Sequence, residues 1–186
     1  MRLFVSVDLP DSLTDAIEAV QADFSDADGL DCTDPAQAHV TLKFLGDTEP
    51  ERVGEIETAI ETAVEVADVG PFDCTIEGLG VFPSRDYIRV VWAGVREGNR
   101  AAALTRLHDA LETELTALGF DADTQEFTPH VTLARMNDAR GKSVVQETLD
   151  EREPTVGTFR VEAVRLTESR LTNAGPAYET VSAVEL

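Results

Sequence analysis

The feature that most constrains this chain is a tetrapeptide that occurs twice, around two of its three histidines. His39-Val40-Thr41-Leu42 recurs as His130-Val131-Thr132-Leu133, and the remaining histidine is His108. With average residue usage, a match of this kind between any two of three histidines arises by chance on the order of once in a thousand. The repetition therefore indicates a duplicated unit.

The elements expected around the two tetrapeptides follow one order in both halves of the chain. Alternating and helix-spaced apolar residues predict strand, helix, His-bearing strand, helix and strand, over residues 2–82 and again over residues 87–171. We interpret this order as two similar lobes related by an approximate twofold axis. Since no Ser-, Gly- or Pro-rich linker divides them, we treat residues 1–186 as a single domain, whose lobes are able to exchange strands.

Individual elements are placed by their apolar spacing and by glycine and proline breaks. A leucine stripe from Leu104 to Leu118 predicts the longest helix, which Gly119 closes. The expected strands are 2–8, 38–45, 72–82, 87–95, 127–136, 159–171 and 178–185, and the expected helices are 11–24, one starting at Pro50, 99–119 and 141–152.

The charge of the chain indicates the salt concentration of its surroundings rather than its activity. Asp and Glu number 36 against 15 Lys and Arg, a net charge of −21, and only Lys43 and Lys142 are lysine. Acid spread along the whole chain with so little lysine favours a halophilic archaeon, whose molar salt screens charges beyond about 3 Å. The same charge excludes a generic basic clamp for nucleic acid, whose affinity depends on Lys and Arg.

The remaining composition points to a soluble, reduced, cytoplasmic protein with no membrane partner. Cys32 and Cys74 are too few for a disulfide framework or a four-thiolate zinc site. No apolar run approaches the roughly 20 residues that span a bilayer. Apolar and polar side chains alternate over the first eight residues, as in a strand, and these residues show no cleavage site of a secretory signal.

The duplicated tetrapeptide carries side chains suited to phosphodiester hydrolysis without a metal. Alternation along a strand turns His39 with Thr41 to one face, and likewise His130 with Thr132, while the Val and Leu residues face the core. One neutral imidazole can take a proton from water, and one imidazolium can protonate the leaving alkoxide. The two hydroxyls can donate to the non-bridging phosphoryl oxygens.

Two other interpretations of the histidines stay open at this point. The His-Thr pairs could be structural, hydrogen-bonded in a cleft without a catalytic role. A two-histidine metal site lacks a third ligand, because His108 flanks the leucine stripe of a helix and no acid has ligand spacing beside either motif. We therefore expect no metal and no cofactor, and no catalytic role for His108.

Both motifs and several other segments resemble one known family. Residues 39–46 (HVTLKFLG) and 128–135 (TPHVTLAR) are similar to the two signature motifs of the two-histidine (2H) phosphoesterase superfamily. The nearest branch is the RNA 2′,3′-cyclic phosphodiesterases, historically called 2′-5′ RNA ligases. Further segments fit that branch: residues 2–10, 80–83, 91–94 and 169–178.

The resemblance implies a bilobed α+β fold, in which each lobe has an antiparallel sheet that lines a central cleft, with helices outside. It implies hydrolysis of RNA ends that carry a 2′,3′-cyclic phosphate, leaving a 2′-phosphate; tRNA fragments are one class of such ends. Some members also join or cleave 2′-5′ linkages. Carried over by motif position, His39 is the proton donor and His130 the proton acceptor. We expect a monomer, because two lobes complete the site within one chain.

Three residues near the motifs are weaker candidates. Strand alternation places Lys43 on the face of His39, where it could bind phosphate. Alternation turns Arg135 away from His130, although the family places an Arg near the cleft and a bulge could bring it round. Alternation also places Phe44 on the face of the strand opposite to His39, so we expect its ring to pack in the core rather than to stack on a base.

Two alternative functions follow from the same residues. One is a phosphodiesterase for a small cyclic phosphate nucleotide, which competition between RNA and nucleotide would distinguish. The other is a noncatalytic module that binds RNA ends, which would bind without forming product.

Overall fold

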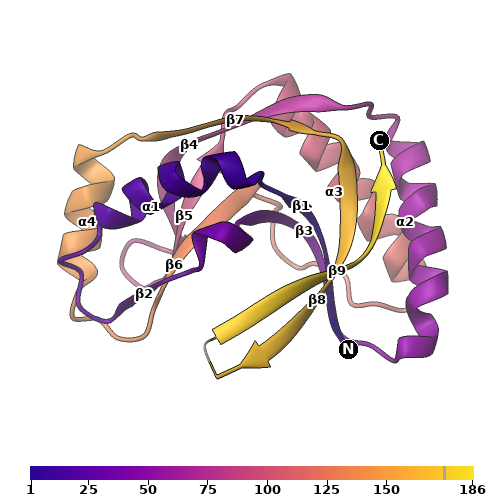
Figure 1. The fold of residues 1–186 in the computed structure, drawn as a ribbon, viewed down its shortest axis with the longest axis horizontal. Helices are drawn as coiled ribbons and strands as arrows, with labels where there is room; N and C mark the ends of the chain where they lie inside the picture. Colours follow the sequence, from indigo (N-terminus) through magenta and orange to yellow (C-terminus); the bar gives the residue numbers. More distant parts are fainter. Residues whose placement is uncertain (174) are drawn as a thin grey trace.

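The computed structural model describes residues 1–173 and 175–186, which form a curled antiparallel sheet with four α-helices outside it (Figure 1). The strands are β1 (Arg2–Asp8), β2 (Leu30–Cys32), β3 (His39–Asp47), β4 (Phe72–Pro83), β5 (Ile88–Val95), β6 (His130–Met136), β7 (Thr155–Val161), β8 (Ala163–Thr172) and β9 (Gly175–Glu185). The α-helices are α1 (Thr14–Ala22), α2 (Val53–Ala67), α3 (Asn99–Ala117) and α4 (Lys142–Glu151).

The sheet consists of two halves that meet at one residue pair. The strand order is β7-β4-β5-β6-β3-β1-β8-β9, with β2 added beside β6. Only Val40 and Val131 pair between β3 and β6, whereas the other neighbours in that order share four or more pairs. We call β3-β1-β8-β9 the first half and β6-β5-β4-β7 the second half. The predicted α+β class with two antiparallel lobes is confirmed.

The two sequence repeats exchange strands between these halves. Strand β4, from the first repeat, pairs with β5 and β7 in the second half. Strand β8, from the second repeat, pairs with β1 and β9 in the first half. The prediction of a single strand over 159–171 is wrong for this reason: the chain passes from the second half to the first at Glu162, which separates β7 from β8.

The helices cover the two ends of the molecule (Figure 1). Helices α2 and α3 pack against each other beside the first half, and α1 contacts β6 and β7 in the second. The predicted leucine stripe forms the buried face of α3, where Leu104, Leu107, Leu111 and Leu115 have no exposed surface. Among the described residues, no helix combines the length and apolar character needed to cross a membrane.

Candidate active site

The two motif strands lie side by side, joined at the second residue of each tetrapeptide. Val40 of β3 and Val131 of β6 pair antiparallel, and both are fully buried. In an antiparallel ladder the next residues oppose each other in crossed order, so His39 faces Thr132 and Thr41 faces His130. The valines face the core, and the four polar side chains share the opposite face. The geometry therefore brings together the four residues that the sequence singles out.

Both imidazoles are held in the same way by the backbone that precedes them. His39 Nδ1 lies 2.9 Å from the Gln37 carbonyl oxygen, and His130 Nδ1 lies 2.7 Å from the Thr128 carbonyl oxygen. Because a carbonyl oxygen only accepts, each Nδ1 carries the proton and donates it. The Nε2 of each ring is then the nitrogen that accepts a proton when the ring is neutral and donates one when it is charged.

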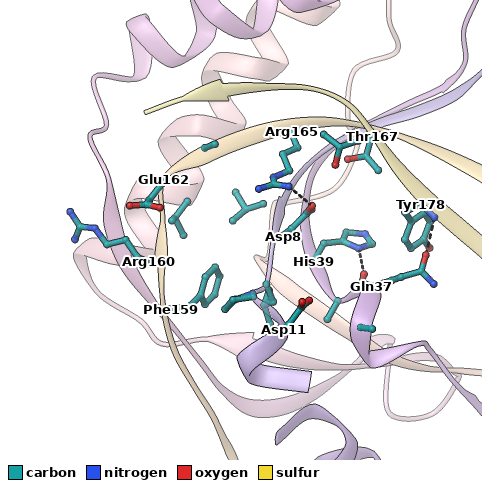
Figure 2. A pocket seen from close by; sticks show the side chains of 18 of the residues that line it. Asp8, Asp11, Gln37, His39, Phe159, Arg160, Glu162, Arg165, Thr167 and Tyr178 are labelled. Carbon is teal, nitrogen blue, oxygen red and sulfur yellow. Dashed lines mark hydrogen bonds and ion pairs between the residues drawn. The ribbon is translucent and has the colours of Figure 1, made fainter. Parts of the chain in front are cut away.

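The electrostatic surroundings of the two imidazoles differ. Burial lowers the pKa of His39, whereas the hydrogen bond to the Gln37 carbonyl and the charge of the nearby Asp8 carboxylate raise it. Burial also lowers the pKa of His130; the hydrogen bond to the Thr128 carbonyl raises it, and the charges of His39 and Arg135 lower it further. Asp8 lies opposite His39 in the β1–β3 ladder (Figure 2), whereas Gly94 lies opposite His130 in the β5–β6 ladder. Only His39 has a neighbouring carboxylate in its ladder.

The threonine hydroxyls are available to a ligand. Thr41 and Thr132 are both half-buried on the face that carries the histidines. Within residues 1–173 and 175–186, neither hydroxyl takes part in a hydrogen bond to another protein group. A hydroxyl in such a position can donate to an oxyanion that comes to lie between the two imidazoles.

A β-bulge follows the threonine in both motifs. In the β1–β3 ladder Ser6 opposes Thr41 and Val5 opposes Lys43, so Leu42 is an extra residue. In the β5–β6 ladder Leu133 is the extra residue at the matching position. A bulge reverses the faces of all residues beyond it. The strand alternation used for the sequence predictions therefore fails after Leu42 and after Leu133.

The bulge overturns two predictions made for the first motif. The Lys43 side chain is fully buried away from the histidine face, with its ammonium 2.6 Å from Glu112 Oε2 and 3.3 Å from Asp123 Oδ1. The Lys43 ammonium is therefore paired with protein carboxylates, and its contact with a substrate phosphate stays a prediction. Phe44 does not pack in the core: it is 65% exposed, and its ring centroid lies 6.1 Å from that of Phe4 beside His39.

The second bulge has the matching effect on Arg135. This residue occupies the place in β6 that Phe44 occupies in β3, and its side chain is exposed. The positive charge of Arg135 lowers the pKa of both His39 and His130, so the guanidinium lies within electrostatic reach of both imidazoles. Alternation alone placed this side chain on the far face, and the bulge at Leu133 explains the difference.

Aromatic rings flank each imidazole, and sequence reasoning missed most of them. The rings of Phe4 and Tyr178 lie 4.9 and 5.0 Å from that of His39. Those of Phe82 and Trp92 lie 4.9 and 5.9 Å from that of His130. These neighbours come from β1, β9, β4 and β5, and the order of the strands cannot be derived from their separate apolar patterns.

One glycine in the wall of the site is required by its neighbour. Gly80 of β4 pairs with Trp92 of β5, and the indole ring lies across the glycine. A Cβ at residue 80 would lie 2.1 Å from the ring, a separation that side chains do not tolerate. Gly80 thus allows the Trp92 ring to lie flat against β4, where it contacts Phe82 and His130.

Two cavities open beside the histidines. The larger, of about 560 Å³, is lined by His39 together with Phe4, Asp8, Arg165 and Tyr178 (Figure 2). The smaller, of about 380 Å³, is lined by residues that include Thr41, Phe44, Phe82, residues 123–128 and His130. One cavity therefore adjoins His39, and the other adjoins Thr41 and His130.

One further cluster near the site has the residue types of a metal centre, but the Lys43 ammonium already lies beside its carboxylates. Potential ligand atoms of His108, Glu112 and Asp123 lie within 4.8 Å of one another. The Lys43 ammonium contacts both carboxylates, and His108 Nδ1 donates to the Leu42 carbonyl oxygen at 2.8 Å. We therefore assign no metal to this cluster. His108 is buried and packs against Phe127, outside the set formed by the motif residues.

Comparison with known proteins gives one family and a consistent set of relatives. The model of the 2′-5′ RNA ligase superfamily matches residues 9–173. A protein named RNA 2′,3′-cyclic phosphodiesterase from Methanothermobacter thermautotrophicus is 34% identical over 100% of this chain and 99% of its own. Relatives with the same name are 34% identical in Archaeoglobus fulgidus, over the full length of both chains, and 40% identical in Aeropyrum pernix, over 79% of this chain and 81% of that protein.

Solved structures share the fold over the whole chain. A crystal structure of a Thermus thermophilus protein superposes with a TM-score of 0.78 at 26% identity, covering 100% of this chain and 98% of that one. Escherichia coli LigT in complex with 3′-AMP superposes with a TM-score of 0.79 at 22% identity, covering 100% and 97% of the two chains. The fold of this chain is thus shared with both proteins.

Proposed function

The chain belongs to the 2′-5′ RNA ligase superfamily, and from this premise we propose that it is an RNA 2′,3′-cyclic phosphodiesterase. In the proposed reaction, water attacks the phosphorus of a 2′,3′-cyclic phosphate at an RNA end. The bond from phosphorus to O3′ breaks, O3′ takes a proton, and the product ends in a 2′-phosphate and a 3′-hydroxyl. The relatives that carry this name cover the chain almost completely, which supports the assignment.

The observation that carries this proposal is the pairing of two identical acid–base groups across one junction. His39 and His130 lie on adjacent strands on either side of the Val40–Val131 pair, each with Nδ1 tied to the backbone. In-line displacement needs a base on the side of the attacking water and an acid on the side of the leaving oxygen. Two imidazoles with free Nε2 atoms that face one phosphorus meet this need without a metal.

The asymmetry between Asp8 and Gly94 supports a specific division of roles. The Asp8 carboxylate favours the charged form of His39, so we assign His39 as the proton donor to O3′. His130 has no such partner in its ladder, and the charges of His39 and Arg135 add to burial in lowering its pKa, which favours the neutral form. We assign His130 as the acceptor of the proton from water.

Charge that develops on the phosphoryl oxygens has three proposed partners. The hydroxyls of Thr41 and Thr132 donate to the two non-bridging oxygens, because each lies across the ladder from one imidazole. Arg135 supplies a positive charge that acts on both imidazoles and hence on the space between them. Its guanidinium can hold a phosphoryl oxygen by paired hydrogen bonds.

The proposed substrate is an RNA end, with tRNA fragments as one class. The same residues support ligation: when a 5′-hydroxyl of a second RNA replaces water, it gives its proton to His130, the bond from phosphorus to O3′ breaks, and O3′ takes a proton from His39. The product has a 2′-5′ linkage, and cleavage of that linkage is the same reaction in reverse, with the proton transfers exchanged. We propose that the monomer is the active form, since both motifs, and thus all four catalytic candidates, come from one chain.

The test is hydrolysis of an oligoribonucleotide that ends in a 2′,3′-cyclic phosphate, with identification of the product end. We expect a 2′-phosphate in the presence of EDTA. A 3′-phosphate product, or turnover that EDTA abolishes, would contradict the proposed reaction. Competition with an excess of 2′,3′-cyclic AMP measures whether the enzyme prefers RNA. Equal turnover of the mononucleotide would indicate a small cyclic phosphate as substrate instead.

A further inference from the structure

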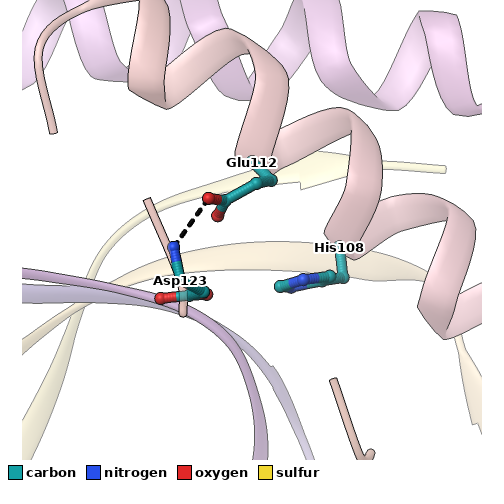
Figure 3. A group of neighbouring side chains, drawn as sticks. All are labelled: His108, Glu112 and Asp123. Carbon is teal, nitrogen blue, oxygen red and sulfur yellow. Dashed lines mark hydrogen bonds between the residues drawn. The ribbon is translucent and has the colours of Figure 1, made fainter. Parts of the chain in front are cut away.

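The buried Lys43 ammonium is the centre of a polar network that joins the first motif strand to the chain before the second motif. Nζ donates to the Asp121 carbonyl oxygen at 2.7 Å and forms ion pairs with Glu112 and Asp123 at 2.6 and 3.3 Å. Glu112 belongs to α3, and Asp123 follows that helix (Figure 3). Asp121 also follows α3. The network thus joins β3 to the connection between α3 and β6.

That connection, residues 121–129, has no helix or strand and leads directly into His130. We call it the α3–β6 segment. Its residues 121–126 are all exposed, so burial of their side chains does not hold them. Asp123 N donates to Glu112 Oε1 at 2.8 Å, which ties the start of the segment to the same carboxylate that contacts Lys43. Such a segment keeps one conformation only if specific polar contacts fix it.

The end of the α3–β6 segment is anchored to the same part of β3. The Phe127 ring stacks on His108, with ring centroids 4.2 Å apart and planes within 5°. His108 Nδ1 in turn donates to the Leu42 carbonyl oxygen at 2.8 Å. One residue further, the Thr128 carbonyl oxygen accepts the proton of His130 Nδ1. The bulge of the first motif is therefore linked to the start of the segment through Lys43 and to its end through His108.

We propose that Lys43 is a positioning residue: its ammonium fixes the α3–β6 segment, and through Thr128 that segment orients the His130 imidazole. The segment also forms a wall of the 380 Å³ cavity, in which residues 123–128 lie beside Thr41 and His130. The first motif strand thus controls the geometry of the second motif. The effect on turnover rests on the proposed function, whereas the effect on the segment does not.

The two repeats differ in this coupling. Ala134 occupies the place in β6 that Lys43 occupies in β3, and both residues are buried behind the bulge. The second motif therefore has no ammonium with which to hold the chain before His39. The ammonium is fully buried, whereas the Glu112 and Asp123 side chains are 24% and 40% exposed.

The test is amide hydrogen exchange of the Lys43→Met protein, with Lys142→Met as the control. Lys142 is the only other lysine, and its ammonium donates to the Asp86 carbonyl oxygen, which is not part of the α3–β6 segment. We expect faster exchange at residues 121–129 in Lys43→Met and no change there in Lys142→Met. Unchanged exchange of that segment in a folded Lys43→Met protein would overturn the proposal.

Kinetics of the same variants separate positioning from mere stability. A displaced His130 should lower kcat by about 10²-fold while KM changes little, because misplacement of a reacting group acts on the chemical step. The low-pH limb of the rate profile, which reports the base, should move, and the high-pH limb should not. A loss confined to KM, or equal movement of both limbs, would contradict a role through His130.

Two further variants keep the proposal testable if Lys43→Met does not fold. Asp123→Asn and Glu112→Gln each remove one carboxylate partner of the ammonium. We expect each to raise exchange at residues 121–129, and unchanged exchange in both would overturn the proposal. If the wild type shows no hydrolysis of cyclic phosphates, the proposed function fails while the exchange result still decides the role of Lys43 in the segment.

Discussion

Asp8 lies directly across from His39 in the β1–β3 ladder, so a carboxylate accompanies one of two otherwise equivalent imidazoles. Burial lowers the pKa of His39, and the negative charge of Asp8 raises it. Asp8 is itself held by the Ser6 hydroxyl at 3.0 Å and by Arg165 at 3.5 Å. A duplicated site with two identical motifs thus contains a built-in difference between its two histidines.

Replacement of Asp8 by Asn should lower the pKa of His39 further and leave that of His130 nearly unchanged. His39 acts as an acid only below its own pKa, so the high-pH limb of kcat/KM should move to lower pH. Histidine-selective NMR titration measures both pKa values directly. Asp11→Asn, at the rim of the same cavity, is the matched control. An unchanged His39 pKa in Asp8→Asn would refute the role of the carboxylate.

The two histidines should differ in their response to the leaving group. A p-nitrophenolate leaves without a proton, so a p-nitrophenyl phosphodiester needs the base but not the acid. We expect His39→Ala to retain most of its activity toward this substrate, and His130→Ala to lose about 10²–10⁴-fold, the usual contribution of a general base. The opposite pattern would exchange the two assignments, and equal losses would show that neither residue has a separate role.

The bulges predict that Phe44 and Arg135 bind substrate, one in each motif. Phe44→Ala should raise KM for RNA by roughly tenfold, since stacking of a base on an aromatic ring contributes about 1–3 kcal/mol. Phe44→Trp should preserve KM, and Leu171→Ala, another exposed apolar residue, should have no effect. Arg135→Gln should raise KM and reduce its dependence on salt. A normal KM in Phe44→Ala would mean that the exposed ring does not contact the nucleotide.

Sequence reasoning found the central residues because their signal is local. The repeated His-Val-Thr-Leu specifies a strand with two faces, and neither bulge intervenes between His39 and Thr41 or between His130 and Thr132. The same alternation misplaced Lys43 and Phe44, since the extra residue at Leu42 reverses the faces of both. A bulge depends on the partner strand, and no pattern within β3 alone reveals it.

The long-range arrangement was predictable in class but not in detail. Apolar periodicity gave the α+β class and the buried stripe of α3, because both follow from spacing within one segment. It did not divide residues 159–171 at Glu162, since both strands there are apolar and only their partners differ. Asp8 was missed for a related reason: its proximity to His39 follows from the pairing of β1 with β3.

The acidity of the chain predicts stability that depends on salt. With a net charge of −21, repulsion between carboxylates should destabilise the folded state when screening is weak. We expect the melting temperature to rise as KCl increases from about 0.1 M to about 1 M, over which the screening length falls from about 10 to 3 Å. Sucrose, which is excluded from protein surfaces without screening charge, is the control. A melting temperature independent of KCl would contradict a halophilic origin.

The most direct test of catalysis by the two histidines is hydrolysis of a 2′,3′-cyclic phosphate RNA end by wild type, His39→Ala and His130→Ala, in molar KCl with EDTA. We predict that wild type forms the 2′-phosphate end and that each variant loses about 10²–10⁴-fold in rate. Variants that remain folded by circular dichroism exclude loss through unfolding. More than a tenth of the wild-type rate in either folded variant would contradict catalysis by a pair of histidines.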